Sequence, residues 1–344
     1  MNTIKAGIIG ATGYTGSELV RLLHSHPSAR VTAITSESRA GEKFSDVHPF
    51  FQGICDLKLI KSEDFNPEEV DVIFFALPHG VSMKYTAKYY GKKPIIDFSG
   101  DFRLDSPQTY EKWYGQSHTY VSGFENAAYG MPELFPDGIK EAPLIANPGC
   151  FPTGAALAIA PLVKSGKVDK KNIIIDSKTG VTGAGIKSKP VNMFSIVNDN
   201  FKAYGLKNHR HTVEIELNMK RLTGEDTIVQ FTPHLLPVDR GILTTAYLKP
   251  VTELDENQIQ KLFVDYYSDA PFIRMRNNAP EIKQVRGTNY ADIYTTFDER
   301  TGNIIAVSAI DNLVKGAAGQ AVHNMNIKFN LHETEGLNIV PFQP

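Results

Sequence analysis

One of the two cysteines in the 344-residue chain, Cys150, lies in the stretch LIANPGCFPTGAALAI. A strand-like run precedes it, a Pro-Gly turn comes next, and Thr153 onward has helical character, which places Cys150 just ahead of a helix N-terminus. The positive end of the helix dipole stabilises a thiolate at such a position. The second cysteine, Cys55, has neither a histidine nor a helix start beside it, so we expect a small buried residue there. The spacing favours Cys150 as a nucleophile.

The stretch KNHRHTVEIELNMKRL contains the acid/base groups that a reactive thiol needs. Here His209 and His211 precede a helix-like run, with Thr212 as the expected N-cap and Glu214 in the first turn. Glu214 follows His211 by three positions, which is within reach for orienting an imidazole. A histidine pair alone is more often structural. Together with a thiol, it predicts a site for proton transfer in covalent catalysis.

Three glycines near the start of the chain, in GIIGATGYTGSEL, follow one strand-like run and open a helix-like run. Glycines at this place permit a tight turn and let backbone N–H groups approach a pyrophosphate. The spacing is GxxGxxG rather than GxGxxG, so the strand and helix around it support the prediction of a dinucleotide site. The expected cofactor-binding residues in this loop are Gly10, Thr12, Gly13, Tyr14, Thr15 and Gly16.

The choice between NAD and NADP is usually made about 20 positions after these glycines, where NAD-binding proteins place an acidic residue. This chain has TSESRAG there. Ser36, Ser38 and Arg39 offer hydroxyl donors and a cation suited to a 2′-phosphate, which favours NADP. Glu37 lies in the same stretch and could instead turn toward the ribose.

The elements that must position these residues follow an alternating pattern in the first half of the chain. Strand-like runs at 3–10, 30–35, 70–77 and 94–99 alternate with helix-like runs, which predicts a doubly wound, Rossmann-type parallel sheet with helices on both faces. After residue 165 strand-like runs dominate, with fewer helices between them. This change predicts an α+β second domain on a largely antiparallel sheet.

The last helix-like run, 311–329, is expected to return to the first domain, because its small residues permit close packing. We therefore expect a cofactor-binding domain formed by residues 1–148 and 312–344. Residues 149–311 would form the domain for catalysis, substrate binding and oligomerisation.

Composition limits the class of protein. The 36 lysines and arginines nearly balance 38 acidic residues, and no basic stretch is interleaved with aromatics, so binding to nucleic acid or to an anionic membrane is not expected. Neither a signal-like N-terminus nor a run of about 18 apolar residues occurs, which favours a cytoplasmic protein. Two cysteines provide neither a disulfide framework nor a cysteine-based metal site. The expected partner is a small molecule.

Other positions in the sequence suit anion binding. Arg103 in GDFRL could grip a substrate carboxylate with both nitrogens, or could form a surface ion pair. The stretch SKTGVTGAGIKSK (177–189) is rich in glycine, hydroxyls and lysine, as in a phosphate or carboxylate site, although a flexible loop would have the same composition. Its proposed substrate contacts are Ser177, Gly183 and Lys187. Pro78, His79 and Ser99 follow later strands, at the sheet edge where ligands of such folds lie.

Seven motifs in this order resemble the N-acetyl-γ-glutamyl-phosphate reductase family: GATGYTGSEL, FALPHG, IIDFSGDFRL, YGMPEL, ANPGCFPT, SKTGVTGAG and HRHTVEIE. The resemblance covers essentially the whole chain. It implies NADPH-dependent reduction of an acyl phosphate to a semialdehyde in the arginine pathway, through a thioester on Cys150. It also implies a glyceraldehyde-3-phosphate dehydrogenase type of second domain, and a homodimer or homotetramer.

The same resemblance assigns roles to single residues. His211 is the first choice for acid/base, with His209 as the alternate, and Asn312 resembles the amide that fixes the nicotinamide. Members often have proline after HRHT, where this chain has Val213.

Three alternatives remain open from the sequence. An aspartate-semialdehyde dehydrogenase uses the same chemistry on a shorter substrate. A short-chain reductase needs Tyr-x-x-x-Lys on one helix, which Tyr89 and Lys93 match, although Gly91 interrupts them. A redox-sensing NADP-binding regulator would explain the glycines and Cys150, but it would not need the histidine pair.

Overall fold

The computed structural model of the protein describes residues 3–187 and 190–342, and it divides into two compact units. Unit 1 contains the chain through Pro132, then Pro136–Pro148 and Ala317–Asn338. Unit 2 contains Glu133–Phe135, Gly149–Gly316 and the chain from Ile339 onward.

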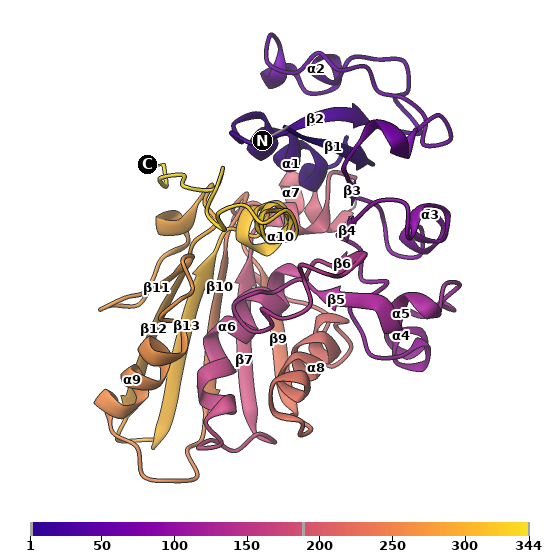
Figure 1. The fold of residues 1–344 in the computed structure, drawn as a ribbon. Coiled ribbons are helices and arrows are strands. Elements are labelled where there is room, and N and C mark those ends of the chain that lie inside the picture. Colours follow the sequence, from indigo (N-terminus) through magenta and orange to yellow (C-terminus); the bar gives the residue numbers. More distant parts are fainter. Residues whose placement is uncertain (1–2, 188–189, 343–344) are drawn as a thin grey trace. The chain divides into compact units, whose positions relative to one another are not determined.

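Six parallel strands form the sheet of unit 1, in the order β2-β1-β3-β4-β6-β5 (Figure 1). Every residue of β3, β4 and β6 is buried, as expected for a parallel sheet covered on both faces. The predicted doubly wound sheet is confirmed. Because β1 lies between β2 and β3, the segments that follow β1 and β3 meet at one edge of the sheet, where ligands of such folds bind. The strands are β1 (Ile4–Ile9), β2 (Ala29–Ile34), β3 (Val72–Phe75), β4 (Ile95–Asp97), β5 (Ala127–Tyr129) and β6 (Leu144–Ala146).

Helices and short turns connect these strands, and a helix from the C-terminal part of the chain joins them. That helix, α10, packs against α1, and Asn324 Nδ2 donates to the Gly130 carbonyl at 2.9 Å and to Asn147 Oδ1 at 3.0 Å. The helices of unit 1 are α1 (Tyr14–His24), α2 (Phe44–Val47), α3 (Ser82–Tyr89), α4 (Pro107–Tyr114), α5 (Ser122–Asn126) and α10 (Gly319–Lys328), with 3-10 turns at Pro49–Phe51 and Pro67–Glu69.

The predicted run 311–329 is not one continuous helix. It begins as a π-helix, Val314–Ala318, and only then becomes α10. Gly316 lies inside this π-helix, where the chain comes close to Cys150.

Unit 2 is built on a seven-stranded sheet in the order β11-β12-β13-β10-β7-β9-β8. The β11–β12 and β7–β9 pairs are parallel and the other pairs are antiparallel, so the predicted largely antiparallel sheet is confirmed. The strand-like runs of the sequence after residue 165 all form strands, whereas the short β8 and β11 were not predicted: these runs are NIIID, TIVQFTPHLL, ILTTAYL, ADIYTTF and NIIAVSAI. The strands are β7 (Ile173–Thr179), β8 (Lys202–Ala203), β9 (Val229–Leu235), β10 (Ile242–Leu248), β11 (Ile273–Met275), β12 (Ala291–Asp298) and β13 (Asn303–Ile310).

Three long helices cover one face of this sheet: α6 (Cys150–Lys164), α8 (His211–Thr223) and α9 (Glu256–Tyr266) (Figure 1). Shorter helices are α7 (Phe194–Val197) and the 3-10 turns Val181–Ala184, Pro190–Asn192 and Ile282–Val285. Among residues 3–187 and 190–342, no helix combines the length and the apolar character needed to cross a membrane.

Helix α6 continues through Pro161, a residue that normally breaks a helix because it lacks an N–H. The carbonyl that this proline leaves without its helical partner belongs to Leu157, and it accepts a hydrogen bond from the Tyr267 hydroxyl at 2.8 Å. Burial raises the pKa of Tyr267 well above its ordinary value, so the hydroxyl keeps the proton that it donates. Tyr267 therefore pairs the carbonyl group that Pro161 leaves without its helical partner.

Candidate active site

The glycine loop after β1 has the shape that a dinucleotide requires. Gly10 has a φ of 89°, and a Cβ at this residue would lie 2.6 Å from the Ala76 carbonyl oxygen. A Cβ at Gly16 would overlap the Ala11 carbonyl group, whereas one at Gly13 would meet only open space. Two glycines are thus needed for close packing within the protein, and the third leaves the backbone open to a pyrophosphate.

Helix α1 begins directly after this loop, with Gly13 as its N-cap. Its first turn, which starts with Tyr14 and Thr15, contains no acidic residue, so the N–H groups and the positive end of the dipole are available to an anion. Thr12 Oγ1 lies 3.2 Å from Ser36 Oγ, which joins the glycine loop to the end of β2. The residues present fit a dinucleotide phosphate.

The residues expected to select the cofactor lie at the end of β2. Ser38 and Arg39 are exposed, and the Arg39 guanidinium forms an ion pair with Glu42 at 2.8 Å. Glu37 accepts a hydrogen bond from the Ser62 N–H at 3.1 Å, and hydrogen bonding to Ser62 lowers the pKa of Glu37. Glu37 is therefore an ionised group directed toward Ser62.

The segments that follow β3 and β4 contain Pro78, His79 and Ser99. Pro78 is exposed, His79 Nδ1 accepts the Gly100 N–H at 2.7 Å, and Ser99 Oγ donates to Asp97 at 2.6 Å. These contacts hold two strand ends of unit 1 together at the sheet edge that the fold assigns to ligands.

A buried carboxylate pair behind these segments was not predicted. Asp97 and Asp101 are both fully buried, and burial together with the Asp101 charge raises the pKa of Asp97 to about 6. Asp101 accepts from the Gly80 N–H and from the Tyr110 hydroxyl, at 2.9 Å and 2.8 Å. Only the tertiary fold brings these partners together, and the sequence gives no signal for them.

Arg103 is not a surface residue. It is buried in unit 1, and its Nη2 donates to the Phe98 carbonyl oxygen at 2.5 Å. The surface ion pair that the sequence allowed is therefore wrong, because the loop after β4 folds back over the guanidinium.

In unit 2, Cys150 is the first residue of α6, and Gly149 is the N-cap. The sequence predicted a helix start at Thr153, which is wrong because Pro152 lies in the first turn, where its missing N–H has no helical partner to lose. The correction moves the thiol into the helix terminus itself, where the helix dipole favours a thiolate.

The helix that carries the histidine pair also begins earlier than predicted. Helix α8 starts at His211 with Arg210 as its N-cap, so the expected cap at Thr212 is wrong. His209 remains in the preceding loop. The backbone N–H of His211 donates to His209 Nδ1 at 3.2 Å, and this bond takes the place of a side-chain cap.

Both imidazoles lie in one cluster of rings next to the thiol. The His209 and His211 ring centroids are 4.9 Å apart, and they lie 5.6 and 5.9 Å from the ring of Phe151, the residue after Cys150. Phe231 is 5.5 Å from His209. The structure thus brings together Cys150 and His211, the first residues of two helices, and His209, in the loop before α8.

His209 is held in its neutral form. Burial lowers its pKa to about 4, and the charge of Arg210 acts in the same direction. Because Nδ1 accepts a hydrogen bond from the backbone, the neutral ring has its proton on Nε2 and can only donate from there.

Glu214 has a partner that sequence spacing did not predict. It is fully buried, and its Oε1 accepts a hydrogen bond from the Gly149 N–H at 2.8 Å. Glu214 therefore ties the first turn of α8 to the N-cap of α6, and it fixes the His211 helix against the Cys150 helix.

Tyr204 is a further residue of the site that sequence reasoning missed. Its ring lies 5.6 Å from that of His209, and burial, with the nearby Cys150 charge as a second cause, raises the pKa of Tyr204. A phenol that stays protonated beside the thiol can donate a hydrogen bond.

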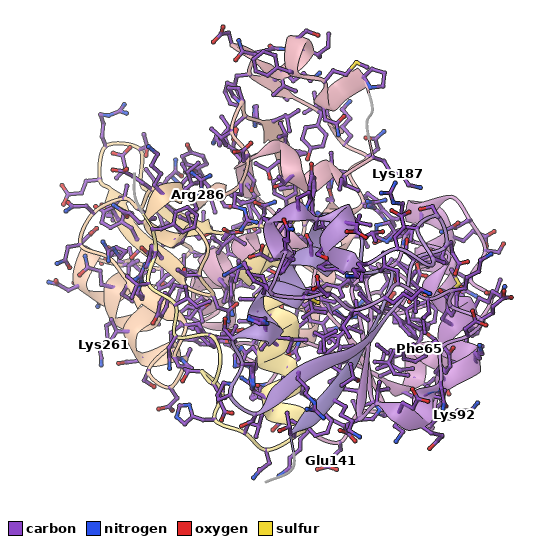
Figure 2. All side chains as sticks on the ribbon, turned by 90° about the horizontal axis from the view of Figure 1, so that it is seen from above. Phe65, Lys92, Glu141, Lys187, Lys261 and Arg286 are labelled. Carbon is purple, nitrogen blue, oxygen red and sulfur yellow. The ribbon has the colours of Figure 1, made fainter. Side chains whose placement is uncertain are left out.

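The predicted substrate contacts of the stretch 177–189 differ in their surroundings. Ser177 is buried on β7, where its hydroxyl lies 2.8 Å from Thr244 Oγ1. Gly183 is exposed in a 3-10 turn, and Lys187 is exposed on a surface loop (Figure 2). The last two positions of the stretch lie outside the described residues.

Asn312, the expected nicotinamide contact, is buried in unit 2. Its Oδ1 accepts the Gly241 N–H at 2.7 Å and its Nδ2 donates to Thr182 Oγ1 at 3.0 Å. Both ends of the amide therefore hold loops of unit 2 in place.

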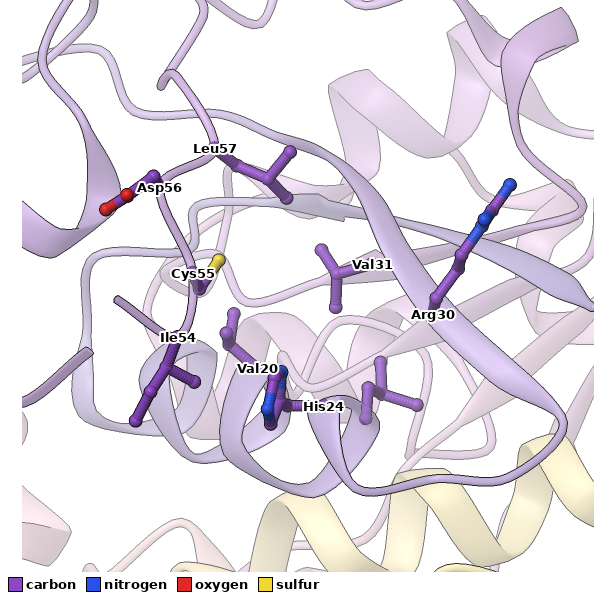
Figure 3. Close-up of a pocket in the computed structure, with 9 residues that line it drawn as sticks. Val20, His24, Arg30, Val31, Ile54, Cys55, Asp56 and Leu57 are labelled. Carbon is purple, nitrogen blue, oxygen red and sulfur yellow. The ribbon is translucent and has the colours of Figure 1, made fainter. Parts of the chain in front are cut away.

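Cys55 lies in a cavity of about 390 Å³ in unit 1 (Figure 3). Val20, Val31 and Leu57 provide apolar walls, and burial raises the pKa of the Cys55 thiol. The thiol resists ionisation, as suits a packing role, but it is half-buried and not buried as the sequence predicted.

The short-chain reductase reading is excluded by the geometry of its two residues. Tyr89 is the last residue of α3 and is fully buried, and Lys93 lies beyond the end of that helix. They cannot form the pair on one helix that this chemistry needs.

Comparison with known families and proteins agrees with this architecture. Residues 5–142 match the semialdehyde dehydrogenase NAD binding domain, and residues 150–312 match the semialdehyde dehydrogenase dimerisation domain. The N-acetyl-gamma-glutamyl-phosphate reductase of Pelotomaculum thermopropionicum is 50% identical over 342 residues, which is 97% of each chain. That of Alkaliphilus metalliredigens is 44% identical over 99% of this chain and 100% of its own.

Solved structures share the fold at low sequence identity. Aspartate semialdehyde dehydrogenase II of Vibrio cholerae, complexed with ASA, has a TM-score of 0.72 at 16% identity, over 96% of this chain and 99% of its own. The Candida albicans aspartate semialdehyde dehydrogenase, solved with NADP, has a TM-score of 0.72 at 17% identity, over 95% and 98%. The expected type of two-domain fold is confirmed.

Proposed function

We infer the roles of the site residues from one premise: the chain belongs to the N-acetyl-γ-glutamyl-phosphate reductase family. It catalyses the NADPH-dependent reduction of N-acetyl-L-glutamyl 5-phosphate to N-acetyl-L-glutamate 5-semialdehyde in arginine biosynthesis, with release of phosphate. The relatives named for this activity are 44–50% identical to the chain, whereas the aspartate enzymes are 16–17% identical. The reading as an aspartate-semialdehyde dehydrogenase is therefore the less supported one.

Unit 1 would hold the cofactor. The glycine loop and the first turn of α1 would bind the pyrophosphate, Ser36, Ser38 and Arg39 would bind the 2′-phosphate, and Pro78 would contact the cofactor at the end of β3. Asn312 is proposed as the amide toward the nicotinamide. When bound there, NADPH supplies the hydride that reduces the acyl group.

Cys150 is the proposed nucleophile. The observation that carries this role is its place as first residue of α6, tied through Gly149 and Glu214 to the helix that begins with His211. The thiolate forms a C–S bond to the acyl carbon as the C–O bond to phosphate breaks, which leaves a thioester. After the carbonyl carbon has been reduced, Cys150 departs as the thiolate and the semialdehyde is released.

His211 is the proposed acid/base group. Protonation of the oxygen on the reduced carbon and its later deprotonation need a group that exchanges a proton near neutral pH. His209 is a poor candidate because its pKa of about 4 leaves it neutral there. We assign His209 to a hydrogen bond from Nε2–H to the substrate.

The substrate anions would be bound by cations and backbone donors. Lys187 and the turn at Gly183 are exposed and suit the phosphate, and Arg103 is the proposed partner of a carboxylate. Ser177 is proposed to support this region from the buried side of β7.

A reaction run backwards tests the thioester. Semialdehyde plus NADP should give one equivalent of NADPH per active site and then stall, because only phosphate can remove the acyl group from Cys150. Addition of phosphate should restore steady turnover, measured by absorbance. A steady rate in phosphate-free buffer, with N-acetylglutamate as product, would show hydrolysis by water and would overturn the phosphorylating mechanism.

Arg39→Ala should weaken NADPH binding by roughly 10- to 100-fold, the range for loss of a charged hydrogen bond. NADH binding should stay nearly unchanged, because NADH lacks the 2′-phosphate, and the lost surface ion pair with Glu42 contributes little. Titration of both cofactors by fluorescence measures this. Equal losses would show that Arg39 does not read that phosphate.

We also propose a homo-oligomer, dimer or tetramer, in the cytoplasm. Ile174 and Tyr247 are register partners on β7 and β10, and both are exposed on the sheet face that does not carry α6. A second copy of the chain would cover this apolar row. Light scattering that gave the mass of a single chain would contradict the proposal.

A further inference from the structure

We propose that Gly316 is a positioning residue for the reaction: the absence of a side chain at this position sets where the Cys150 nucleophile lies. The proposal rests on the role assigned to Cys150 above. The sequence does not predict that Gly316 lies close to Cys150, because 166 positions separate the two residues.

Gly316 leaves no room for a side chain next to Cys150. A Cβ built on Gly316 would lie 2.8 Å from the Cys150 Cβ and 3.2 Å from its Cα. Carbon atoms in favourable contact are about 3.5–4.0 Å apart, so the smallest possible side chain would force a separation of about 0.7 Å or more.

Gly316 is held firmly in its position. Its N–H donates to the Asp311 carbonyl oxygen at 2.9 Å. The Asp311 carboxylate is fully buried and accepts from the N–H groups of Leu313 at 2.9 Å and of Gly287 at 2.7 Å, and it forms an ion pair with Arg240 at 3.3 Å. Asp311 thus fixes the bend that leads into the π-helix.

The neighbour of Gly316 adds a second anchor. Lys315 is fully buried, forms an ion pair with the buried carboxylate of Glu133, and lies 5.3 Å from the centre of the Phe272 ring. If this segment moved, the buried Lys315 ammonium would be separated from the Glu133 carboxylate. The loss of such a partner is costly in a protein interior.

Cys150 must therefore be the group that moves when position 316 gains a side chain. Its Cβ carries the sulfur, so a shift of the Cβ displaces the Sγ relative to the histidines and to the acyl carbon. A misplacement of about 1 Å in an active site can lower the rate about 10²-fold.

Gly316→Ala is the variant that tests the proposal. We expect kcat to fall about 10²-fold with a smaller change in KM, while NADPH still binds and the protein still melts cooperatively. The rate of Cys150 alkylation by iodoacetamide, measured against pH and located by mass spectrometry, should also change, which a structural role elsewhere would not cause. Gly154→Ala on the same helix is the matched control, because its added Cβ would meet neighbours at 3.4 Å or more.

Parent values of kcat and of the alkylation profile in Gly316→Ala would overturn the proposal. If that variant does not fold, Asp311→Asn decides, since it removes the charge that fixes the bend but keeps the size of the side chain. We then expect a lower kcat and an altered alkylation profile, and parent values for both would again contradict the role. Activity that survives Cys150→Ser would instead refute the nucleophile, so the two failures are distinct.

Discussion

Cys150→Ser is expected to lose reductase activity by on the order of 10⁴-fold or more, while NADPH binding is retained. The reason is chemical: a serine hydroxyl stays protonated at neutral pH, and the positive terminus of α6 cannot make it an effective nucleophile. Steady-state NADPH oxidation with enzymatically made N-acetylglutamyl phosphate measures the activity, and fluorescence titration measures binding.

Cys55→Ser is the matched control for this loss. Its thiol is half-buried in the cavity of unit 1, and its raised pKa keeps it protonated, so the variant should retain the parent rate. Comparable turnover in both variants would mean that no covalent thioester forms.

His211→Asn is expected to lower kcat by about 10² to 10⁴, the range for loss of a general acid/base. Asparagine can still form hydrogen bonds but cannot exchange a proton near neutral pH, so the variant separates proton transfer from binding. The pH profile of kcat should lose the limb that reports this group, and stopped-flow absorbance with pre-bound NADPH would locate the loss in the reductive half-reaction.

His209→Asn should instead raise KM more than it lowers kcat. Its imidazole is neutral, and its Nδ1 already accepts a hydrogen bond from the His211 N–H. It can therefore donate one hydrogen bond from Nε2 to the substrate, but it does not take up a proton near neutral pH. The reverse pattern in the two variants would transfer the acid/base role to His209.

The architecture of both units was predictable because most of the strands are short, apolar and clearly bounded. In the runs VDVIFFAL and NIIAVSAI most residues are buried, including all of β3, and such runs carry a strong sequence signal. The strands that were missed, such as β8 with two residues, are fixed by pairing with a neighbour and carry little signal of their own.

Helix starts were predicted less well than strands, because the caps differ from the usual ones. At α6 a proline in the first turn resembles a helix boundary but is compatible with helix, and at α8 a histidine from the preceding loop replaces the expected threonine cap. Both errors shifted the boundary but left Cys150 and the histidines at the helix ends.

Residue type and spacing singled out Cys150 and His211, which the structure places at two helix starts, whereas the contacts that support them could not be predicted. The sequence pointed to Cys150 and His211, but the partners Glu214 and Gly149 are 65 positions apart, and the Gly316 contact joins segments still farther apart. Such contacts exist only after the chain has folded, and no local pattern encodes them.

The hydrogen bond from Gly149 to Glu214 also bears on how this protein can change during evolution. It joins the helix starts that carry Cys150 and His211 across 65 positions of sequence, so the chain between them does not itself set their distance. The entropy of closing a loop grows only logarithmically, by about 0.6 kcal/mol for each doubling of its length. Insertions in the surface turns of that connecting chain therefore cost little free energy, and those turns can diversify in length while the two helix starts keep their geometry.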